Sequence, residues 1–207
     1  MCVIAISPKG IKQPSVSDLR SMWDTNPHGA GYMTIRNNRV EIHKGFMHWQ
    51  DFTRSVKTEA FTDADPVIYH FRIATQGGIC PEMTHPFPLT DKLEMMDKLD
   101  LACSVGVAHN GIIPITTTTK ATDYSDTVLF IVKYLRWLVR SPSDMFIPEI
   151  QTMISEIADS KFALMNSNGD IVTIGKFYNH DGILLSNENH LWKDYFMKGE
   201  FAKCIAF

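Results

Sequence analysis

An apolar strand pattern that begins at the third residue constrains the fold of this chain most strongly. Val3–Ser7 is a short apolar run typical of a buried strand. Seven further segments have the β-branched, aromatic or alternating character of strands: residues 29–36, 39–44, 67–74, 101–108, 161–165, 170–175 and 182–185. They gather toward the two ends of the sequence, with helical patterns in the middle. This order predicts one α+β domain over residues 1–207, with two stacked sheets covered by helices.

Apolar residues with helical spacing mark the predicted helices, which cover residues 15–25, 49–61, 125–140 and 143–159. The dipeptide Asn37-Asn38 between two predicted strands is typical of a hairpin turn. The Gly- and Pro-rich residues 76–88 and the threonine run at 116–119 are predicted surface loops. We see no linker and no internal repeat, which favours a single domain.

The composition argues against several classes of protein. An apolar content of 44% with 21% charged residues is ordinary for a soluble globular domain. A net charge of −3, without any basic run, gives no general attraction to nucleic acid. The longest apolar run, residues 128–139, contains Lys133 and Arg136 and is too short and too charged to span a bilayer. The first residues lack the pattern of a signal peptide, so we expect a cytoplasmic protein.

The cysteines and histidines do not follow metal-ligand spacing. The 4 cysteines show neither CxxC spacing nor the density of a disulfide framework, and the 8 histidines form no HxH or HExxH pattern. We therefore expect no metal and no cofactor. One cysteine is placed unusually, because Cys2 becomes the first residue when Met1 is removed.

A free N-terminal cysteine carries a base and a nucleophile on one residue. The α-amine has a reference pKa of about 7.7–8.0, so much of it is an uncharged base near neutral pH. The thiol has a reference pKa of about 8.5, and its thiolate is the attacking form. The amine of Cys2 is therefore able to accept the thiol proton without a histidine partner. A small buried residue of the first strand is the alternative interpretation of Cys2.

Four motifs follow Cys2 in a fixed order. They are His70-Phe-Arg72-Ile-Ala-Thr75-Gln-Gly77, Thr84-His85-Pro86-Phe87, His109-Asn110-Gly111-Ile-Ile113 and Ser125-Asp126-Thr127. Together with Cys2 they resemble the class II glutamine amidotransferases, whose domain supplies ammonia for glucosamine-6-phosphate and phosphoribosylamine synthesis. The turn Asn26-Pro-His-Gly-Ala-Gly31 resembles one found in several members. The resemblance covers roughly the first 140 residues.

This resemblance implies the four-layer α/β/β/α sandwich of the N-terminal-nucleophile hydrolases. It also implies that Cys2 attacks the side-chain amide of L-glutamine, while Asn110 and the Gly111 N–H form the oxyanion hole. An Asn-Gly pair is by itself more often only a turn.

The resemblance assigns four further residues to binding of glutamine. Arg72 would hold the α-carboxylate through its planar fork of donors, and Asp126 would receive the α-ammonium. Thr75 and His85 would line the pocket. Structural alternatives remain for three of them: an ion pair for Arg72, a helix-start carboxylate for Asp126 and a fold-supporting histidine at 85.

Two positions depart from the family pattern. Gln76 stands where many members have histidine, and Met83 stands where many have asparagine. These departures leave open a stand-alone hydrolase of another γ-glutamyl or acyl amide. A catalytically silent regulatory subunit is a third possibility. For an amidotransferase, 207 residues leave no room for a synthetase domain, so we expect a separate synthetase subunit to accept the ammonia and to dock near the loops at 76–88 and 116–119.

Overall fold

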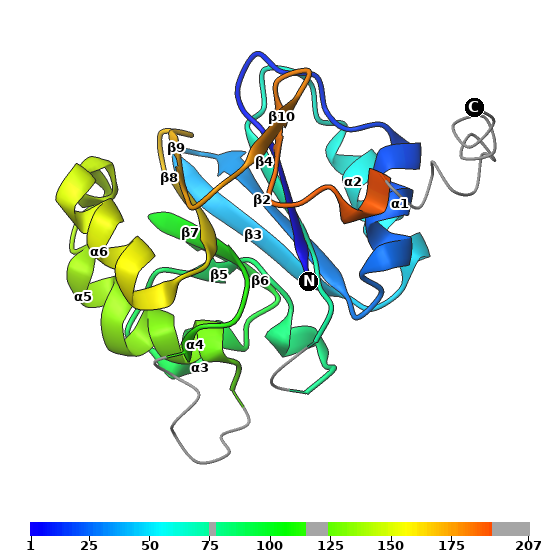
Figure 1. Cartoon of the computed structure of the whole chain (residues 1–207). Helices are drawn as coiled ribbons and strands as arrows, with labels where there is room; N and C mark the ends of the chain where they lie inside the picture. The colour runs from blue at the N-terminus through cyan, green and yellow to red at the C-terminus, as the bar shows by residue number, and fades with distance from the viewer. Residues whose placement is uncertain (75–77, 115–123, 192–207) are drawn as a thin grey trace, which may run out of the picture.

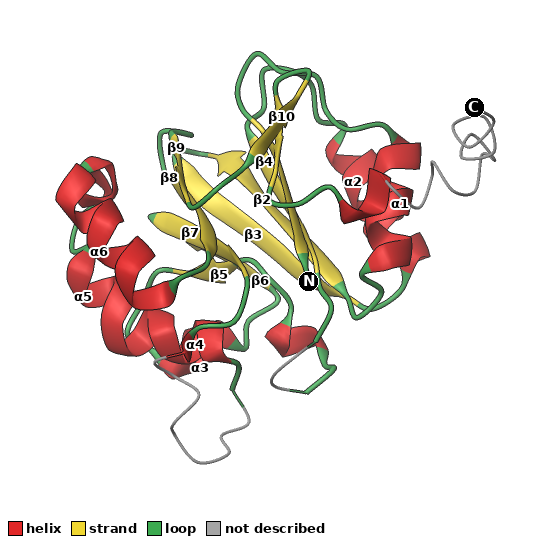
Figure 2. Cartoon of the chain, in the orientation of Figure 1, coloured by secondary structure: helices red, strands yellow, loops and turns green. Residues whose placement is uncertain are grey.

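The computed structural model describes residues 1–74, 78–114 and 124–191. It has mixed α+β architecture with two antiparallel sheets, which confirms the predicted fold class at that level (Figure 1). One sheet has seven strands in the order β10-β11-β1-β4-β2-β3-β6, and the other has four in the order β5-β7-β8-β9. Helices α1 and α2 lie beside the larger sheet, and helices α4 to α6 lie beside the smaller one (Figure 2).

The first half of the chain supplies most of the larger sheet. Its elements are β1 (Val3–Ser7), α1 (Val16–Thr25), β2 (Ala30–Arg36), β3 (Arg39–Phe46), α2 (Trp49–Glu59), β4 (Val67–Phe71) and β6 (Asp100–Cys103), and the later strands β10 (Tyr178–His180) and β11 (Ile183–Leu185) complete it. Ser15 begins α1 with a capping box, in which its side chain accepts from the Asp18 N–H. Asn37 and Asn38 both have positive φ, as a tight hairpin between β2 and β3 requires.

The smaller sheet and its helices come from the middle of the chain. They comprise η1 (Pro81–Met83), β5 (Phe87–Pro88), α3 (Leu93–Met96), β7 (Val105–Asn110), α4 (Asp126–Phe130), the π-helical η3 (Ile131–Leu135), α5 (Arg136–Leu138), η4 (Pro142–Phe146), α6 (Pro148–Ala158), β8 (Lys161–Asn166) and β9 (Ile171–Ile174). Apolar residues of these helices pack with Val107, Phe162 and Leu164 of the sheet in one core.

Strand β1 is apolar from Val3 to Ile6, and both of its faces are buried. Side chains of a strand alternate between the two faces. Val3 and Ala5 pack with Trp23 of α1 and Phe52 of α2, whereas Ile4 and Ile6 belong to a different core. That second core also contains Ala108 of β7 and Ala163 and Met165 of β8, so it fills the space between the two sheets. Cys2, directly before β1, is thereby fixed where the two sheets meet.

Several predicted elements need correction. The segment 101–108, predicted as one strand, breaks at Ser104 into β6 and β7, which belong to different sheets. The predicted helix 143–159 is a 3₁₀ turn followed by α6, because Pro148 starts a new helix. The predicted strand 67–74 ends at Phe71. Strand β10 and the short α3, η1 and β5 were not predicted, and the predicted loop at 116–119 lies outside the described residues.

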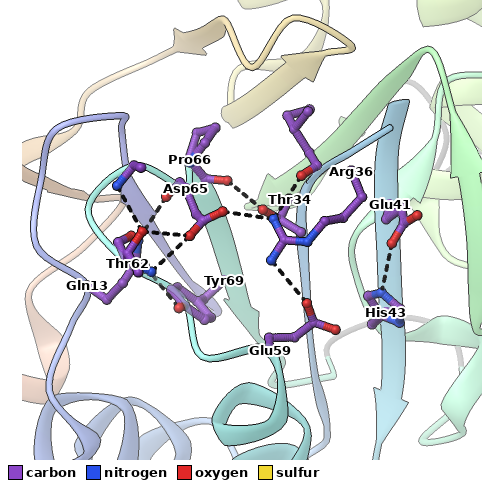
Figure 3. Close-up of polar contacts among 12 residues, drawn as sticks. Gln13, Thr34, Arg36, Glu41, His43, Glu59, Thr62, Asp65, Pro66 and Tyr69 are labelled. Atoms are coloured by element: carbon purple, nitrogen blue, oxygen red, sulfur yellow. Dashed lines mark hydrogen bonds and ion pairs between the residues drawn. The ribbon is translucent and has the colours of Figure 1, made fainter. Parts of the chain in front are cut away.

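A polar network holds the loop between α2 and β4 (Figure 3). Arg36, at the end of β2, pairs with Asp65 at 2.8 Å and Glu59 at 3.2 Å. The Gln13 amide donates to the carbonyls of Thr62 and Asp65, and its oxygen accepts from the Tyr69 hydroxyl. Asp65 and Pro66 directly precede β4, whereas Arg72 follows its other end, so the network supports the fold.

In the described part of the chain, no helix is both long and apolar enough to cross a membrane. No group of three His, Cys, Asp or Glu side chains within residues 1–74, 78–114 and 124–191 is arranged to hold a metal ion. Cys2, Cys80 and Cys103 are free thiols.

Candidate active site

Pairing between β1 and β4 places Cys2 beside Ile73. Val3 of β1 is opposite Phe71 of β4, so the residues that extend each strand by one or two positions lie next to each other. The Ile73 N–H donates to the Cys2 sulfur at 3.4 Å, and the thiol donates to the Ile73 carbonyl at 3.5 Å. The side chain of Cys2 is thereby held at the end of the central strands, next to Arg72.

One narrow polar pocket of about 20 Å³ collects most of the predicted site. Its lining includes Cys2, Arg72, His85, Gly111 and Asp126. These residues come from five separate segments of the sequence. Thr75, the remaining predicted pocket residue, lies outside the described residues. The pocket is smaller than an amino acid, so binding of glutamine there requires its lining side chains to move.

The Cys2 thiol is a weak acid in this structure. Burial raises its pKa, while the Ile73 hydrogen bond, the Arg72 guanidinium and the terminal ammonium act in the opposite direction. Because burial is the largest of these effects, the thiol stays protonated near neutral pH. A nucleophile in this position needs a base to accept its proton.

Arg72 is buried and tied to the backbone around it. Its side-chain Nη1 donates to the Gly78 carbonyl at 2.7 Å. Its backbone N–H donates to the Gly29 carbonyl, and its backbone carbonyl accepts from the His28 N–H. The His28 ring accepts from the Ala74 N–H at 3.0 Å. The turn that contains Gly29 therefore holds the segment after β4 in place. Gly31 packs so closely that an added Cβ would lie 2.3 Å from the His85 carbonyl.

Asp126 is the first residue of α4 and is largely buried. Its two carboxylate oxygens accept from the backbone N–H groups of Ile113 and Thr127, each at 2.8 Å. Burial raises the pKa of this carboxyl, and these hydrogen bonds and the Arg72 charge lower it by a smaller amount. The Asp126 carboxylate therefore both binds backbone N–H groups at the start of α4 and lines the pocket.

Asn110 ends β7, Gly111 follows it, and both line a pocket together with Cys2. The Asn110 side chain is buried and contacts the Ser186 hydroxyl at 2.8 Å, while its Oδ1 has no hydrogen-bond partner among the described residues. Gly111 has φ of 148°, and an added Cβ would lie 2.5 Å from Cβ of Ser160. Glycine at this position is therefore required by the backbone, in addition to any role of its N–H.

Three buried histidines, His70, His85 and His109, form a cluster at the pocket, and His85 and His109 are part of its lining. The rings of His70 and His85 stack with centroids 4.2 Å apart, and His85 is 6.3 Å from His109. Burial lowers the pKa of His70 and His109 to about 3 and lowers that of His85 well below its usual range, so all three are neutral. His70 contacts the His109 carbonyl, and His109 contacts Thr127 and Ser160. Both ring nitrogens of His85 have no partner among the described residues, although the ring lines the pocket.

Residues near the far end of the chain also hold the site, and the sequence did not indicate them. Ser186 and Asn187 follow β11, which pairs with β1. The Asn187 side-chain amide donates to the Cys2 carbonyl, and Lys161 donates to the Ser186 carbonyl. Ser-Asn is ordinary turn composition, so only the β1–β11 pairing reveals this role.

A second pocket, of about 240 Å³, adjoins Cys2. It shares Cys2, Ile73 and Gly111 with the polar pocket and adds Met1, Asn110, Ile112 and Asp159. Its side chains are mostly apolar.

Comparison with models of known protein families gives no match, and comparison with curated protein sequences also gives none.

Proposed function

We propose that this protein is a glutamine amidotransferase of the N-terminal-nucleophile type. The observation that carries the proposal is the convergence of Cys2, Arg72, Gly111 and Asp126 on one pocket. A thiol, a guanidinium and a carboxylate from distant segments suit an amide substrate that bears an α-carboxylate and an α-ammonium. The three cores lie between successive layers of helices, sheet, sheet and helices. This order supports the four-layer sandwich of this superfamily.

In the proposed mechanism, removal of Met1 frees the α-amine of Cys2, which accepts the thiol proton. The sulfur attacks the amide carbon of glutamine, and the resulting oxyanion is stabilised by Asn110 and the Gly111 N–H. The carbon–nitrogen bond then breaks, and the α-ammonium returns the proton to the departing nitrogen, so that ammonia leaves and a γ-glutamyl thioester remains. Water attacks the thioester with the amine as base, which releases glutamate and restores the thiol.

The test combines protein mass, activity and labelling. The active protein should lack Met1 by intact-mass measurement, release ammonia from glutamine, and react with a glutamine-analogue diazoketone at Cys2. Cys2→Ala should abolish turnover and labelling, whereas Cys103→Ala is the matched control. Labelling of another cysteine, with Cys2 dispensable, would exclude this mechanism.

The larger pocket favours a second candidate, a hydrolase of N-substituted γ-glutamyl amides. Ammonia is about as large as water, which occupies about 30 Å³ in the liquid. The pocket of about 240 Å³ beside Cys2 and Asn110 is lined in part by Met1, whose removal would widen it, so it has room for a much larger leaving group. Comparison of kcat/KM for glutamine and for γ-glutamyl alkylamides distinguishes the two: preference for the alkylamides supports the hydrolase.

For the amidotransferase, we propose a separate synthetase subunit as the acceptor of ammonia. Ile79 and Ile112, beside the site, are exposed by 58% and 49%, which suits a surface covered by a partner. Glutaminase activity should rise severalfold when the partner and its acceptor are added. Full activity of the isolated chain, with no protein co-purifying from the source, would favour the hydrolase.

A further inference from the structure

Ser186 connects the first strand of the protein to the side chain of Asn110. Its backbone N–H donates to the Ile4 carbonyl at 3.0 Å, and its hydroxyl oxygen accepts from the Ile4 N–H at 2.9 Å. The same oxygen lies 2.8 Å from Nδ2 of Asn110. All three residues are buried, with Ser186 fully so. Each polar atom in this group therefore needs a partner within the protein or in a ligand.

Only one orientation of the Asn110 amide gives every donor and acceptor of Ser186 and the Ile4 N–H a partner. If Nδ2 faces Ser186, the Ser186 oxygen accepts two protons, its own proton has no acceptor among the described residues, and Oδ1 of Asn110 is also left without a partner. The two ends of an amide have nearly the same shape and are assigned by their hydrogen bonds. If Oδ1 faces Ser186 instead, the Ser186 hydroxyl donates to it. The Ile4 N–H keeps its acceptor, and only the Asn110 NH₂ remains for a ligand.

We infer that Ser186 is a positioning residue for the oxyanion hole. By donating to Oδ1, it directs the NH₂ group of Asn110 toward the pocket that Asn110 shares with Cys2 and Gly111. The inference rests on the proposed function, since the oxyanion is formed when Cys2 attacks an amide. A donor fixed before the reaction stabilises this charge without reorganisation.

A double-mutant cycle tests the inference by activity. Removal of an oxyanion-hole donor typically lowers kcat by about 10²–10³-fold, which is the expected effect of Asn110→Ala. Ser186→Ala should lower kcat at least tenfold with little change in KM, and Ser186→Thr, which retains the hydroxyl, should recover most of the loss. The double variant should be no slower than Asn110→Ala alone. Losses that multiply instead would mean that Ser186 acts independently of Asn110.

Neutron diffraction of the deuterated wild-type protein gives a readout that does not need turnover. The two deuterons of the Asn110 amide should lie on the side facing Cys2, and the Ser186 deuteron should point to Oδ1. Deuterons of Asn110 directed at Ser186 would overturn the inference. A protein that hydrolyses no amide would contradict the proposed function, while the diffraction result would still decide the orientation.

Discussion

The Ile73 N–H donates a hydrogen bond of 3.4 Å to the sulfur of Cys2. This donor favours the thiolate, as does the nearby Arg72 guanidinium, but burial outweighs both and raises the pKa of the thiol. The structure therefore favours the protonated thiol, and the proposed mechanism requires a base to remove its proton. Arg72 consequently has two effects, one on the thiol and one expected on the substrate.

Alkylation by iodoacetamide should report the raised pKa of Cys2. Its rate should increase with pH and approach its maximum only above the ordinary cysteine pKa of about 8.5, because the thiolate reacts. In Arg72→Ala, loss of the positive charge should move the profile to still higher pH. Mass spectrometry of the Cys2 peptide separates this reaction from that of the other cysteines. A profile midpoint below that of a small-molecule thiol would contradict the dominant effect of burial.

Arg72→Ala and Asp126→Ala should each weaken the use of glutamine selectively. Loss of a charge-assisted hydrogen bond costs about 1.5–3 kcal/mol, or roughly tenfold to hundredfold in kcat/KM. An amide without α-amino and α-carboxyl groups should be affected much less. Arg72→Lys is the matched control, because it keeps the charge and loses the planar fork. Equal losses on both substrates would assign the two residues to the fold.

Gly111→Ala should destabilise the protein through two separable effects. The φ of 148° is unfavourable for any residue with a Cβ, and the new methyl group would lie 2.5 Å from Cβ of Ser160. Gly10→Ala is a suitable control, since Gly10 has φ of 90° and no atom within 4 Å of an added Cβ. Chemical denaturation should show a loss of about 1–3 kcal/mol from backbone strain alone at Gly10. A larger loss is expected at Gly111, and equal losses would mean that the Ser160 contact relaxes.

The buried Lys44 should make stability depend on pH. Its ammonium donates to the carbonyls of Glu82 at 2.7 Å and Met96 at 2.6 Å, and lies 3.8 Å from the centre of the Phe87 ring. Burial lowers the pKa of Lys44 to about 7 from 10.5. Between these two values the unfolded chain binds the extra proton, so the free energy of unfolding should rise with pH across this window.

For one proton this slope is at most about 1.4 kcal/mol per pH unit. Denaturation of the wild type and of Lys44→Met at several pH values from neutral to alkaline isolates it, because the other titrating groups are shared. The unfolding free energy of the wild type minus that of Lys44→Met should increase steadily as pH rises from neutral to alkaline. A difference independent of pH would show that Lys44 keeps an ordinary pKa.

The local patterns predicted most of the elements but not their partition between the sheets. The apolar run of β1, the helical spacing over residues 15–25 and the Asn37-Asn38 turn each depend on neighbouring residues, which is why the sequence indicates them. The break at Ser104 does not depend on neighbouring residues. Both β6 and β7 have the sequence pattern of strands, and only the packing of whole sheets separates them. The π-helical η3 likewise interrupts a segment with ordinary helical spacing.

The candidate site shows the same division. Ordered motifs indicated Cys2, Arg72 and Asp126, which the fold brings to one pocket. No sequence pattern indicated Ser186 and Asn187, because their contacts with β1 and Asn110 arise from pairing between strands far apart in the sequence. Hydrogen-bond roles of this kind leave no local pattern in a single sequence.

The pairing of β1 with β11 also affects how the protein folds. Ile4 and Ser186 are separated by 182 positions, and the hydrogen bond between them closes one of the longest loops in the molecule. Contacts of such sequence separation carry a large entropy of loop closure and slow folding. Strand β1 lies between β11 and β4, and its pairing with β4 closes a much shorter loop than its pairing with β11. We therefore expect the surroundings of Cys2 to be completed late in folding, after the other strands of the sheet have paired.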